Sequence, residues 1–384
     1  MEFGEILSGV QNVTWQHIIM YIIGGVLIYL AVKKDYEPML LLPIGFGAIL
    51  VNLPLSTVWE ADGHAGILQI FYQSGILTEM FPILIFVGVG AMCDFTPLFK
   101  NPKMIFFGAA AQFGIFFTVM AALLLSEYVP GIDFSLRESA TIGIIGAADG
   151  PTSIVVASKF AQNLIGPITV AAYSYMALVP IIQPPVIKAL TSKKERTIRM
   201  EYEEVKISKA VKIIFPIAIT LIAGIVAPSS ASLVGLLMFG NLIRECGVLE
   251  RLSKAAQNEL SNIVTLLLGI TIGGTMRHDQ FLQFHTIIIL LLGLVAFVFD
   301  TAGGVLFAKF LNLFSKEKIN PMIGAAGISA FPMSARIIQK MAKDEDPHNF
   351  ILMPAVSANV SGQLGSIVAG GLVLALVPWL EKLI

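Results

Sequence analysis

Charged residues and cysteines are scarce in this chain of 384 residues. Only 13% of the residues are charged, while 56% are hydrophobic, and the mean hydropathy is +0.81. About a quarter of the residues of a soluble domain are charged, so this composition excludes an ordinary soluble fold. The net charge of −1 provides no basic excess for nucleic-acid binding. The two cysteines, Cys93 and Cys246, lack metal-ligand spacing, which argues against a zinc site or a disulfide framework.

Apolar runs long enough to cross a bilayer are, by contrast, abundant. A membrane helix needs about 20 mostly apolar residues, and the pattern predicts ten spans. The first run follows an acidic start and has no small-residue cleavage site, so we expect it to remain as a span and not to be removed as a signal peptide. The predicted spans are residues 17–33, 38–54, 79–95, 104–126, 164–190, 207–228, 231–246, 259–276, 284–311 and 349–380.

Two further apolar stretches, residues 137–159 and 320–343, are interrupted by glycine, proline and polar residues. Lysine and arginine favour the cytoplasmic side of a membrane, and they are densest between residues 188 and 212. This basic region falls on the outside if every apolar stretch crosses the bilayer. We therefore predict that the first interrupted stretch enters and returns from the outside and the second from the cytoplasm. The N-terminus then lies outside.

This arrangement divides the chain into two inverted halves. Residues 1–190 and 207–384 each hold five spans and one re-entrant hairpin, and a cytoplasmic basic linker, residues 191–206, joins them. Ile145–Ala148 is repeated as Ile323–Ala326, followed in each half by a proline and then a serine. The predicted fold is an all-α polytopic membrane protein with about ten transmembrane helices and two broken hairpins. Inverted repeats with broken helices build the binding sites of many secondary transporters.

Asp149 is the most informative residue of the first hairpin. It is flanked on both sides by apolar sequence, where an ionisable group is costly without a partner and marks a functional site. Gly150 and Pro151 break the helix, and the freed carbonyl groups are tolerated only where they are buried or line a cavity. Carboxylate and carbonyl oxygens suit Na⁺ or a proton better than a soft metal. The alternative is that Asp149 merely caps the N-terminus of a helix.

The second hairpin and two of the spans carry uncharged oxygen atoms. Each of these residues, taken alone, more often forms an interhelical hydrogen bond, worth about 0.6 kcal/mol, than an ion ligand. Only convergence on Asp149 assigns them to its site. They are Asn320 and Ser329 of the hairpin, Asn359, Ser361 and Ser366 of the last span, and Tyr175 in the fifth span.

Two charged residues have two open interpretations each. Asp300 lies deep in an apolar run, where it either joins an ion path or pairs with a helix terminus. Arg336 is the only basic residue close to the break in the second hairpin. It either holds a carboxylate bidentately from the cytoplasmic side or anchors the chain on that side.

These motifs resemble those of the membrane beta subunits of biotin-dependent, sodium-pumping decarboxylases, which act on oxaloacetate, methylmalonyl-CoA or glutaconyl-CoA. The resemblance extends over almost the whole chain. It is strongest at Gly146–Thr152, at Asn320, Gly324, Ser329 and Arg336, and at Asn359–Gly362.

The resemblance implies a division of labour between subunits. A carboxyltransferase alpha subunit moves a carboxyl group onto the biotin of a separate biotin carrier subunit, so this chain needs no covalent cofactor. The present chain then decarboxylates carboxybiotin, consumes a proton and moves Na⁺ outward. A small single-span membrane subunit, a trimer of this chain and a bacterial cytoplasmic (inner) membrane location are further implied.

The resemblance also implies roles for individual residues. Asp149 is the main Na⁺ ligand, and Tyr175 assists ion binding or proton delivery. Arg336 is the candidate for binding the carboxylate of carboxybiotin. The assisting Na⁺ ligands are Asn320, Ser329 and Asn359, and Gly150, Pro151, Thr152 and Gly324 belong to the same motifs.

Two other classes of function remain open from the residues alone. A passive Na⁺-coupled carboxylate transporter uses the same inverted repeats, but it moves its solute without any biotin protein. A structural membrane anchor for a soluble enzyme needs neither Asp149 nor the polar residues of the hairpins. The compact length, without a long N-terminal extension, favours a carboxyl-CoA system, although another subunit selects the acyl substrate.

Overall fold

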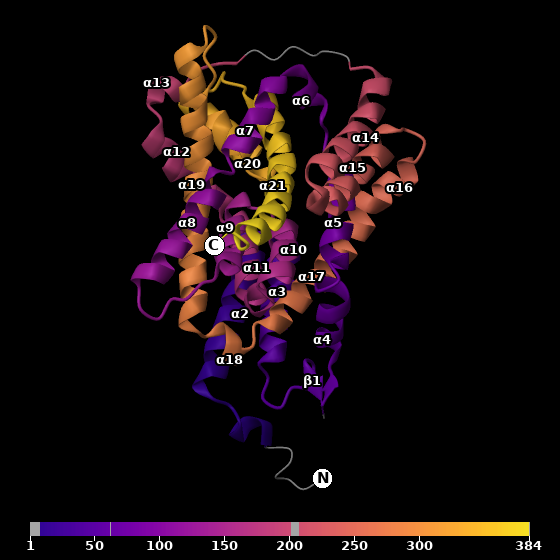
Figure 1. Ribbon diagram of the computed structural model, residues 1–384, viewed down its shortest axis with the longest axis vertical. Helices are drawn as coiled ribbons and strands as arrows, with labels where there is room; N and C mark the ends of the chain where they lie inside the picture. Colours follow the sequence, from indigo (N-terminus) through magenta and orange to yellow (C-terminus); the bar gives the residue numbers. More distant parts are fainter. Residues whose placement is uncertain (1–7, 62, 201–206, 384) are drawn as a thin grey trace.

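The computed structural model describes residues 8–61, 63–200 and 207–383, and these residues are almost entirely helical (Figure 1). Within these ranges the strands are β1 (Glu60–Ala61) and β2 (His64–Ala65), which pair antiparallel in a two-stranded sheet. The predicted all-α polytopic fold is confirmed. Part of the predicted linker, residues 201–206, and the ends of the two predicted halves, residues 1–7 and 384, lie outside the described residues.

The first half of the chain folds into short and long helices that follow the predicted apolar runs. They are α2 (Trp15–Lys34), α3 (Pro38–Val51), α4 (Ile67–Phe71), α5 (Met80–Met92), α6 (Thr96–Lys100), α7 (Ile105–Ala110), α8 (Phe113–Tyr128), α9 (Leu136–Gly143), α10 (Gly150–Phe160), α11 (Ile165–Ala177), α12 (Val179–Leu190) and α13 (Lys193–Arg196).

The second half follows its own apolar runs in the same way. Its helices are α14 (Lys209–Val226), α15 (Ala231–Glu245), α16 (Glu250–Ala255), α17 (Ser261–Thr275), α18 (His278–Phe281), α19 (Phe284–Phe314), α20 (Met333–Glu345) and α21 (Leu352–Leu380).

Five helical segments of the described chain are long and apolar enough to cross a membrane, or up to seven if each of two bent pairs counts as one span. The bent pairs are residues 67–92, with an angle of 61°, and residues 162–190, with an angle of 68°. Each of the ten predicted apolar runs contains helix, but α3, α15 and α17 have only 14, 15 and 15 residues. The number of ten spans therefore stays a prediction.

Helices of the two halves pack against each other in matching pairs. α17 lies on α3, and α15 lies on α5. Glycine makes both contacts close: a Cβ atom at Gly273 would lie 2.3 Å from the carbonyl oxygen of Ile44, and one at Gly240 would lie 2.0 Å from that of Val87. A π-helical turn also precedes the helix at the same place in each half, at Tyr72–Ile76 before α5 and at Ala256–Leu260 before α17.

The first interrupted stretch is a hairpin whose two ends lie together. α9 continues into a 3₁₀ turn, Ile144–Ala147, the chain breaks at Ala148 with φ of 52°, and α10 returns. Asn163 Nδ2, just beyond the hairpin, donates to Glu138 Oε1 near its beginning at 3.3 Å. The two ends of the hairpin therefore lie close together.

The second interrupted stretch is also a hairpin, formed by a 3₁₀ turn at Pro321–Gly327, a break and α20. The side-chain amides of Asn320, before it, and Asn349, after it, donate to the same two carbonyl oxygens, those of Arg196 and Ile198. Ion pairs from Arg196 to Glu345 and from Arg199 to Asp346, both 2.7 Å, tie the described part of the linker to the end of α20.

The long helix α19 runs along the long axis of the molecule and contacts both hairpins (Figure 1). Two of its residues one turn apart make these contacts. A Cβ atom at Gly146 of the first hairpin would lie 2.5 Å from Asp300 Oδ2, and one at Gly324 of the second would lie 1.9 Å from the carbonyl oxygen of Gly304. Residues four apart share one face of a helix, so one face of α19 holds both hairpins.

Candidate functional site

The breaks of the two hairpins meet in the interior of the protein. The backbone N–H of Ser329 donates to the carbonyl oxygen of Ala147 at 3.1 Å, which joins the second break to the first. Residues 328–332 and 148–149 are both non-helical. Broken helices tolerate free backbone groups where these are buried in protein or line a cavity, and the crossing provides this environment.

Asp149 lies at this crossing and is 95% buried, with an exposed fraction of 5%. Its Oδ2 accepts hydrogen bonds from Ser366 Oγ at 2.8 Å and Ser329 Oγ at 3.2 Å. Its Oδ1 accepts from the backbone N–H of Thr152 at 3.3 Å, so Asp149 is also the N-cap of α10. The positive end of the α10 dipole favours a negative charge here. The capping role and the convergence of polar residues are thus both present.

α21 contributes one polar face to the crossing. The side-chain amide of Asn359 donates to the carbonyl oxygens of Ala326 at 3.1 Å and Ile328 at 2.7 Å. The amide of Gln363 donates to the carbonyl oxygen of Ser329. Asn359 Oδ1 is buried and has no hydrogen-bond partner among the described residues, which leaves an oxygen atom available beside the second break.

A cavity of about 400 Å³ adjoins Asp149. Both hairpin breaks line it, at residues 148–151 and 329–333, and residues of α3, α5 and α11 form other parts of the wall. Its ionisable lining residues, within the described chain, are Asp149, Glu37 and Tyr173, and this lining holds no lysine, arginine or histidine. An acidic cavity without an internal cation is suited to bind one.

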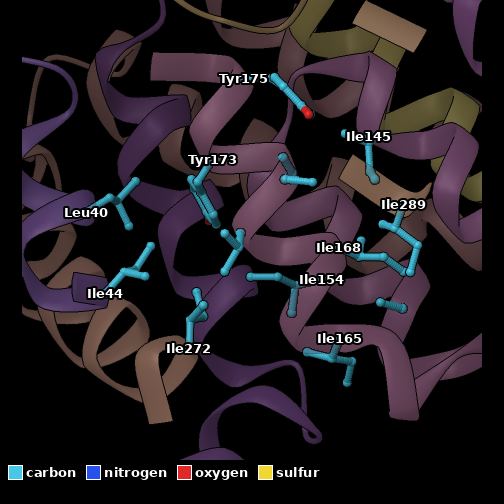
Figure 2. Packing of buried hydrophobic residues seen from close by; sticks show 14 of the residues in the cluster. Leu40, Ile44, Ile145, Ile154, Ile165, Ile168, Tyr173, Tyr175, Ile272 and Ile289 are labelled. Carbon is cyan, nitrogen blue, oxygen red and sulfur yellow. The ribbon is translucent and has the colours of Figure 1, made fainter. Parts of the chain in front are cut away.

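Tyr173 and Tyr175 point to different sides of α11 (Figure 2). The Tyr173 ring lies against the first break, because a Cβ atom at Gly150 would lie 2.1 Å from its Cζ. The ring is 2% exposed, and its hydroxyl group has no hydrogen-bond partner among the described residues. Tyr175, the predicted site residue, instead donates its hydroxyl group to the carbonyl oxygen of Leu290 in α19. Tyr173 is therefore the tyrosine next to Asp149.

Asn320 lies at the outer end of the second hairpin and not among the partners of Asp149. Its Nδ2 donates to the carbonyl oxygens of Arg196 and Ile198 at 2.9 and 2.8 Å. Its Oδ1 accepts from the backbone N–H of Met322 at 3.1 Å, which caps the 3₁₀ turn. The structure thus gives this side chain the role of holding the linker to the hairpin.

Arg336 lies on the exposed face of α20, three residues into the helix. Its side chain forms no ion pair with the described part of the chain. It does not line the cavity. A guanidinium group in this exposed position is accessible to a carboxylate.

The remaining predicted site residues shape the two hairpins. Pro151 occupies the first turn of α10, where its missing N–H is not needed. The Thr152 hydroxyl group is buried without a partner among the described residues. Gly150 and Gly324 are required by close contacts, with the Tyr173 ring and with the Gly304 carbonyl oxygen.

Asp300 is fully buried beside Gly114 in the first turn of α8, and neither of its carboxylate oxygens has a hydrogen-bond partner among the described residues. It therefore lies near a helix terminus without forming a hydrogen bond to it, and both interpretations of this residue stay open. Its Oδ2 atom contacts the first hairpin at Gly146. Asp300 does not line the cavity beside Asp149.

Sequence reasoning did not assign Tyr173, Gln363 or Glu37 to the site. One signal was present for α21, because Asn359, Gln363 and Ser366 follow one another at intervals of four and three residues and so share one helix face. No comparable signal distinguishes Tyr173 from Tyr175, or marks Glu37, which the sequence places in a turn between two spans.

Comparison with known proteins places this architecture in one family. Residues 16–377 match the family described as the Na⁺-transporting oxaloacetate decarboxylase beta subunit. The chain is 50% identical over 370 residues to the glutaconyl-CoA decarboxylase subunit beta of Acidaminococcus fermentans, covering 96% of each chain. It is 48% identical over 390 residues to the methylmalonyl-CoA decarboxylase subunit beta of Propionigenium modestum, covering 96% of this chain and 97% of the relative.

A third relative has a different acyl substrate in its name. The chain is 45% identical over 419 residues to the oxaloacetate decarboxylase beta chain of Haemophilus ducreyi, covering 95% of this chain and 96% of the relative. The expected resemblance is thereby confirmed, and the alternative of a passive carboxylate transporter is not favoured. This chain belongs to the family of Na⁺-transporting oxaloacetate decarboxylase beta subunits, the membrane subunits of sodium-transporting decarboxylases.

Proposed function

We propose that this chain decarboxylates carboxybiotin and uses the reaction to move Na⁺ outward, with Asp149 as the Na⁺-binding carboxylate. One observation carries the assignment of the site: a buried carboxylate at the crossing of two broken hairpins borders an acidic cavity without a basic residue in its described lining. A buried negative charge without a cationic partner is unfavourable. A bound Na⁺ or a proton removes this cost, and exchange between the two is the chemistry that a sodium pump needs.

The Na⁺ ligands that we propose are oxygen atoms around the crossing. The Asp149 carboxylate, the Ser329 hydroxyl group and the Asn359 side-chain oxygen are expected ligands, and the Ser366 hydroxyl group was a candidate from the sequence. The hydroxyl group of Tyr173 is added because of its position. Asn359 Oδ1 keeps its expected role as a candidate, since it is buried and has no hydrogen-bond partner among the described residues. We retain Asn320 and Tyr175 only as indirect contributors, through the linker and through α19.

Arg336 is the proposed contact for the carboxylate of carboxybiotin. Decarboxylation breaks the bond between the biotin nitrogen and the carboxylate carbon, releases CO₂ and places a proton on the nitrogen. An exposed guanidinium group recognises a carboxylate with two parallel hydrogen bonds. Na⁺ and carboxybiotin then act on the same hairpin, because Ser329 and Arg336 both belong to the second one.

Coupling requires that both ligands bias the same two-state element. We propose that this element is the pair of crossed hairpins, which move against the remaining helices and expose Asp149 to alternate sides. The proposed inverted halves, residues 1–190 and 207–384, supply one hairpin each. The matched packing of α17 on α3 and α15 on α5, and the two π-helical turns, support this division.

The proposed setting is the bacterial cytoplasmic (inner) membrane, in a complex with other subunits. Carboxybiotin arrives on a separate biotin carrier subunit, after a carboxyltransferase alpha subunit has loaded it. A small single-span subunit and two further copies of this chain complete the proposed assembly. The exposed apolar side chains of α14, which is hardly buried by the rest of the chain, are available for lipid or protein contacts.

The test is Na⁺-dependent decarboxylation of free carboxybiotin by the reconstituted membrane complex, measured together with uptake of ²²Na⁺. Asp149→Asn keeps the size of the side chain but removes its charge, and we expect it to abolish both activities. Asp133→Asn makes the same chemical change at an exposed loop residue and should behave as wild type. Full Na⁺-responsive turnover by Asp149→Asn contradicts the assignment of the site.

A further inference from the structure

Glu37 is a second carboxylate at the cavity beside Asp149. It lies in the turn between α2 and α3, at the N-cap of α3, with a φ angle of 37°. Its side chain lines the cavity together with Leu40, one turn into α3. The left-handed backbone conformation is unfavourable for a residue with a side chain and indicates that the turn is held in place by its surroundings.

The Glu37 carboxylate is half-buried and unpaired. It forms no hydrogen bond and no ion pair with the described part of the chain, and it does not cap α3 with its side chain. Burial raises the pKa of this carboxyl group, and the negative charge of the neighbouring Asp35 raises it further. The nearby lysines at the end of α2, Lys33 and Lys34, are exposed and make no ion pair with it.

Tyr173 connects this carboxylate with the site. The side chain lines the same cavity as Glu37, Asp149 and Leu40. That hydroxyl group is buried and has no partner among the described residues. Gln257 and Gln363 also line the cavity and offer uncharged oxygen atoms. The cavity thus presents two carboxylates and a free hydroxyl group, without a basic side chain in its described lining.

We infer that Glu37 is a second cation-attracting carboxylate of the pump, which draws Na⁺ into the cavity and holds it near Tyr173 on the way to or from Asp149. This inference rests on the proposed function. Two carboxylates facing one water-accessible space lower the electrostatic potential in it and raise the local concentration of cations. Removal of the outer charge should therefore weaken Na⁺ binding without removing the reaction itself.

The test compares two acids of the same turn in the reconstituted complex. Glu37→Gln removes the charge that lines the cavity, and Asp35→Asn removes the exposed charge two residues earlier. The Na⁺ concentration that gives half-maximal carboxybiotin decarboxylation is measured with choline as the compensating ion, so that ionic strength is constant. We expect Glu37→Gln to raise this Na⁺ concentration by about tenfold, with kcat at saturating Na⁺ within about twofold of wild type. Asp35 also acts electrostatically on Glu37 but does not line the cavity, so we expect Asp35→Asn to change the Na⁺ concentration by no more than about twofold.

A third variant separates charge from structure. Glu37→Asp keeps the negative charge and should restore most of the Na⁺ affinity, whereas a purely structural role predicts that it is as impaired as Glu37→Gln. The inference is overturned if Glu37→Gln and Asp35→Asn show the same Na⁺ dependence, or if Glu37→Gln lowers only kcat. The proposed function stays intact in either case, as long as the wild type responds to Na⁺. A wild type that does not respond to Na⁺ overturns the proposed function, and the inference with it.

Discussion

At the scale of single residues, the site depends on side chains that serve structure and chemistry together. Asp149 caps α10 through Oδ1 and faces two serine hydroxyl groups through Oδ2. The cap keeps the carboxylate in place when a cation leaves, because one oxygen retains its backbone partner. A hydrogen bond to a charged group is worth about 1.5–3 kcal/mol, so this anchoring is substantial compared with the binding of a monovalent ion.

The two tyrosines of α11 provide a residue-scale prediction. Tyr173→Phe removes a buried hydroxyl group with no partner among the described residues, so we expect little loss of stability but a several-fold increase in the Na⁺ concentration for half-maximal decarboxylation. Tyr175→Phe removes the hydrogen bond to the Leu290 carbonyl oxygen. It should lower stability by about 1 kcal/mol and leave Na⁺ affinity unchanged. Thermal unfolding in detergent and Na⁺ titration of the rate measure both, and the reverse pattern would restore Tyr175 to the site.

At the scale of secondary-structure elements, α19 and α21 determine where the hairpins cross. α19 touches the first hairpin at Asp300 and the second at Gly304, and α21 binds the second break through Asn359 and Gln363. The glycine contacts bring backbone directly against backbone, as small residues do at membrane helix interfaces. Such a backbone contact leaves little room for the helices to shift, so it fixes the position of the second hairpin on α19.

The contact between Gly304 and Gly324 can be tested with a matched glycine elsewhere. Gly304→Ala places a Cβ atom 2.0 Å from the Gly324 carbonyl oxygen, which must push the second hairpin away from α19. We expect a loss of about 1–3 kcal/mol, seen as a Tm lower by several degrees. Gly25→Ala in α2, where a Cβ atom would meet nothing within 4 Å, should keep or slightly raise the Tm. Equal Tm values for the two variants would mean that the close contact is absent.

At the scale of the whole molecule, we predict that the two hairpins enter the membrane from opposite sides. Asn163 and Glu138 close the first one, and the carbonyl oxygens of Arg196 and Ile198 hold both ends of the second. The last described turn of the chain lies near α9, because Glu381 pairs with Arg137 at 2.8 Å. In the predicted topology, each hairpin gives a different side of the membrane access to the site.

Labelling of single cysteines tests this orientation. In a Cys246→Ser background, with Cys93 buried, we expect Asp133→Cys and Asn163→Cys to react with a membrane-impermeant maleimide from outside intact cells. Lys194→Cys and Lys343→Cys, which are also exposed positions, should react only in inverted vesicles. Labelling of Asp133→Cys and Asn163→Cys from opposite sides would show that the first hairpin crosses the membrane and would refute the re-entrant topology.

Composition and local pattern were sufficient for the membrane class and the positions of the helix breaks, and they single out Asp149 as the candidate residue. A charge among apolar residues and a Gly-Pro pair have the same physical consequences wherever the chain folds. The sequence pattern did not determine which side chains surround Asp149. Residues two apart on a helix point to different sides, so only packing decided that Tyr173, not Tyr175, faces the first break. Packing likewise brought Glu37 from a turn into the cavity and placed Asn320 at the linker, because each contact joins segments that are far apart in the sequence.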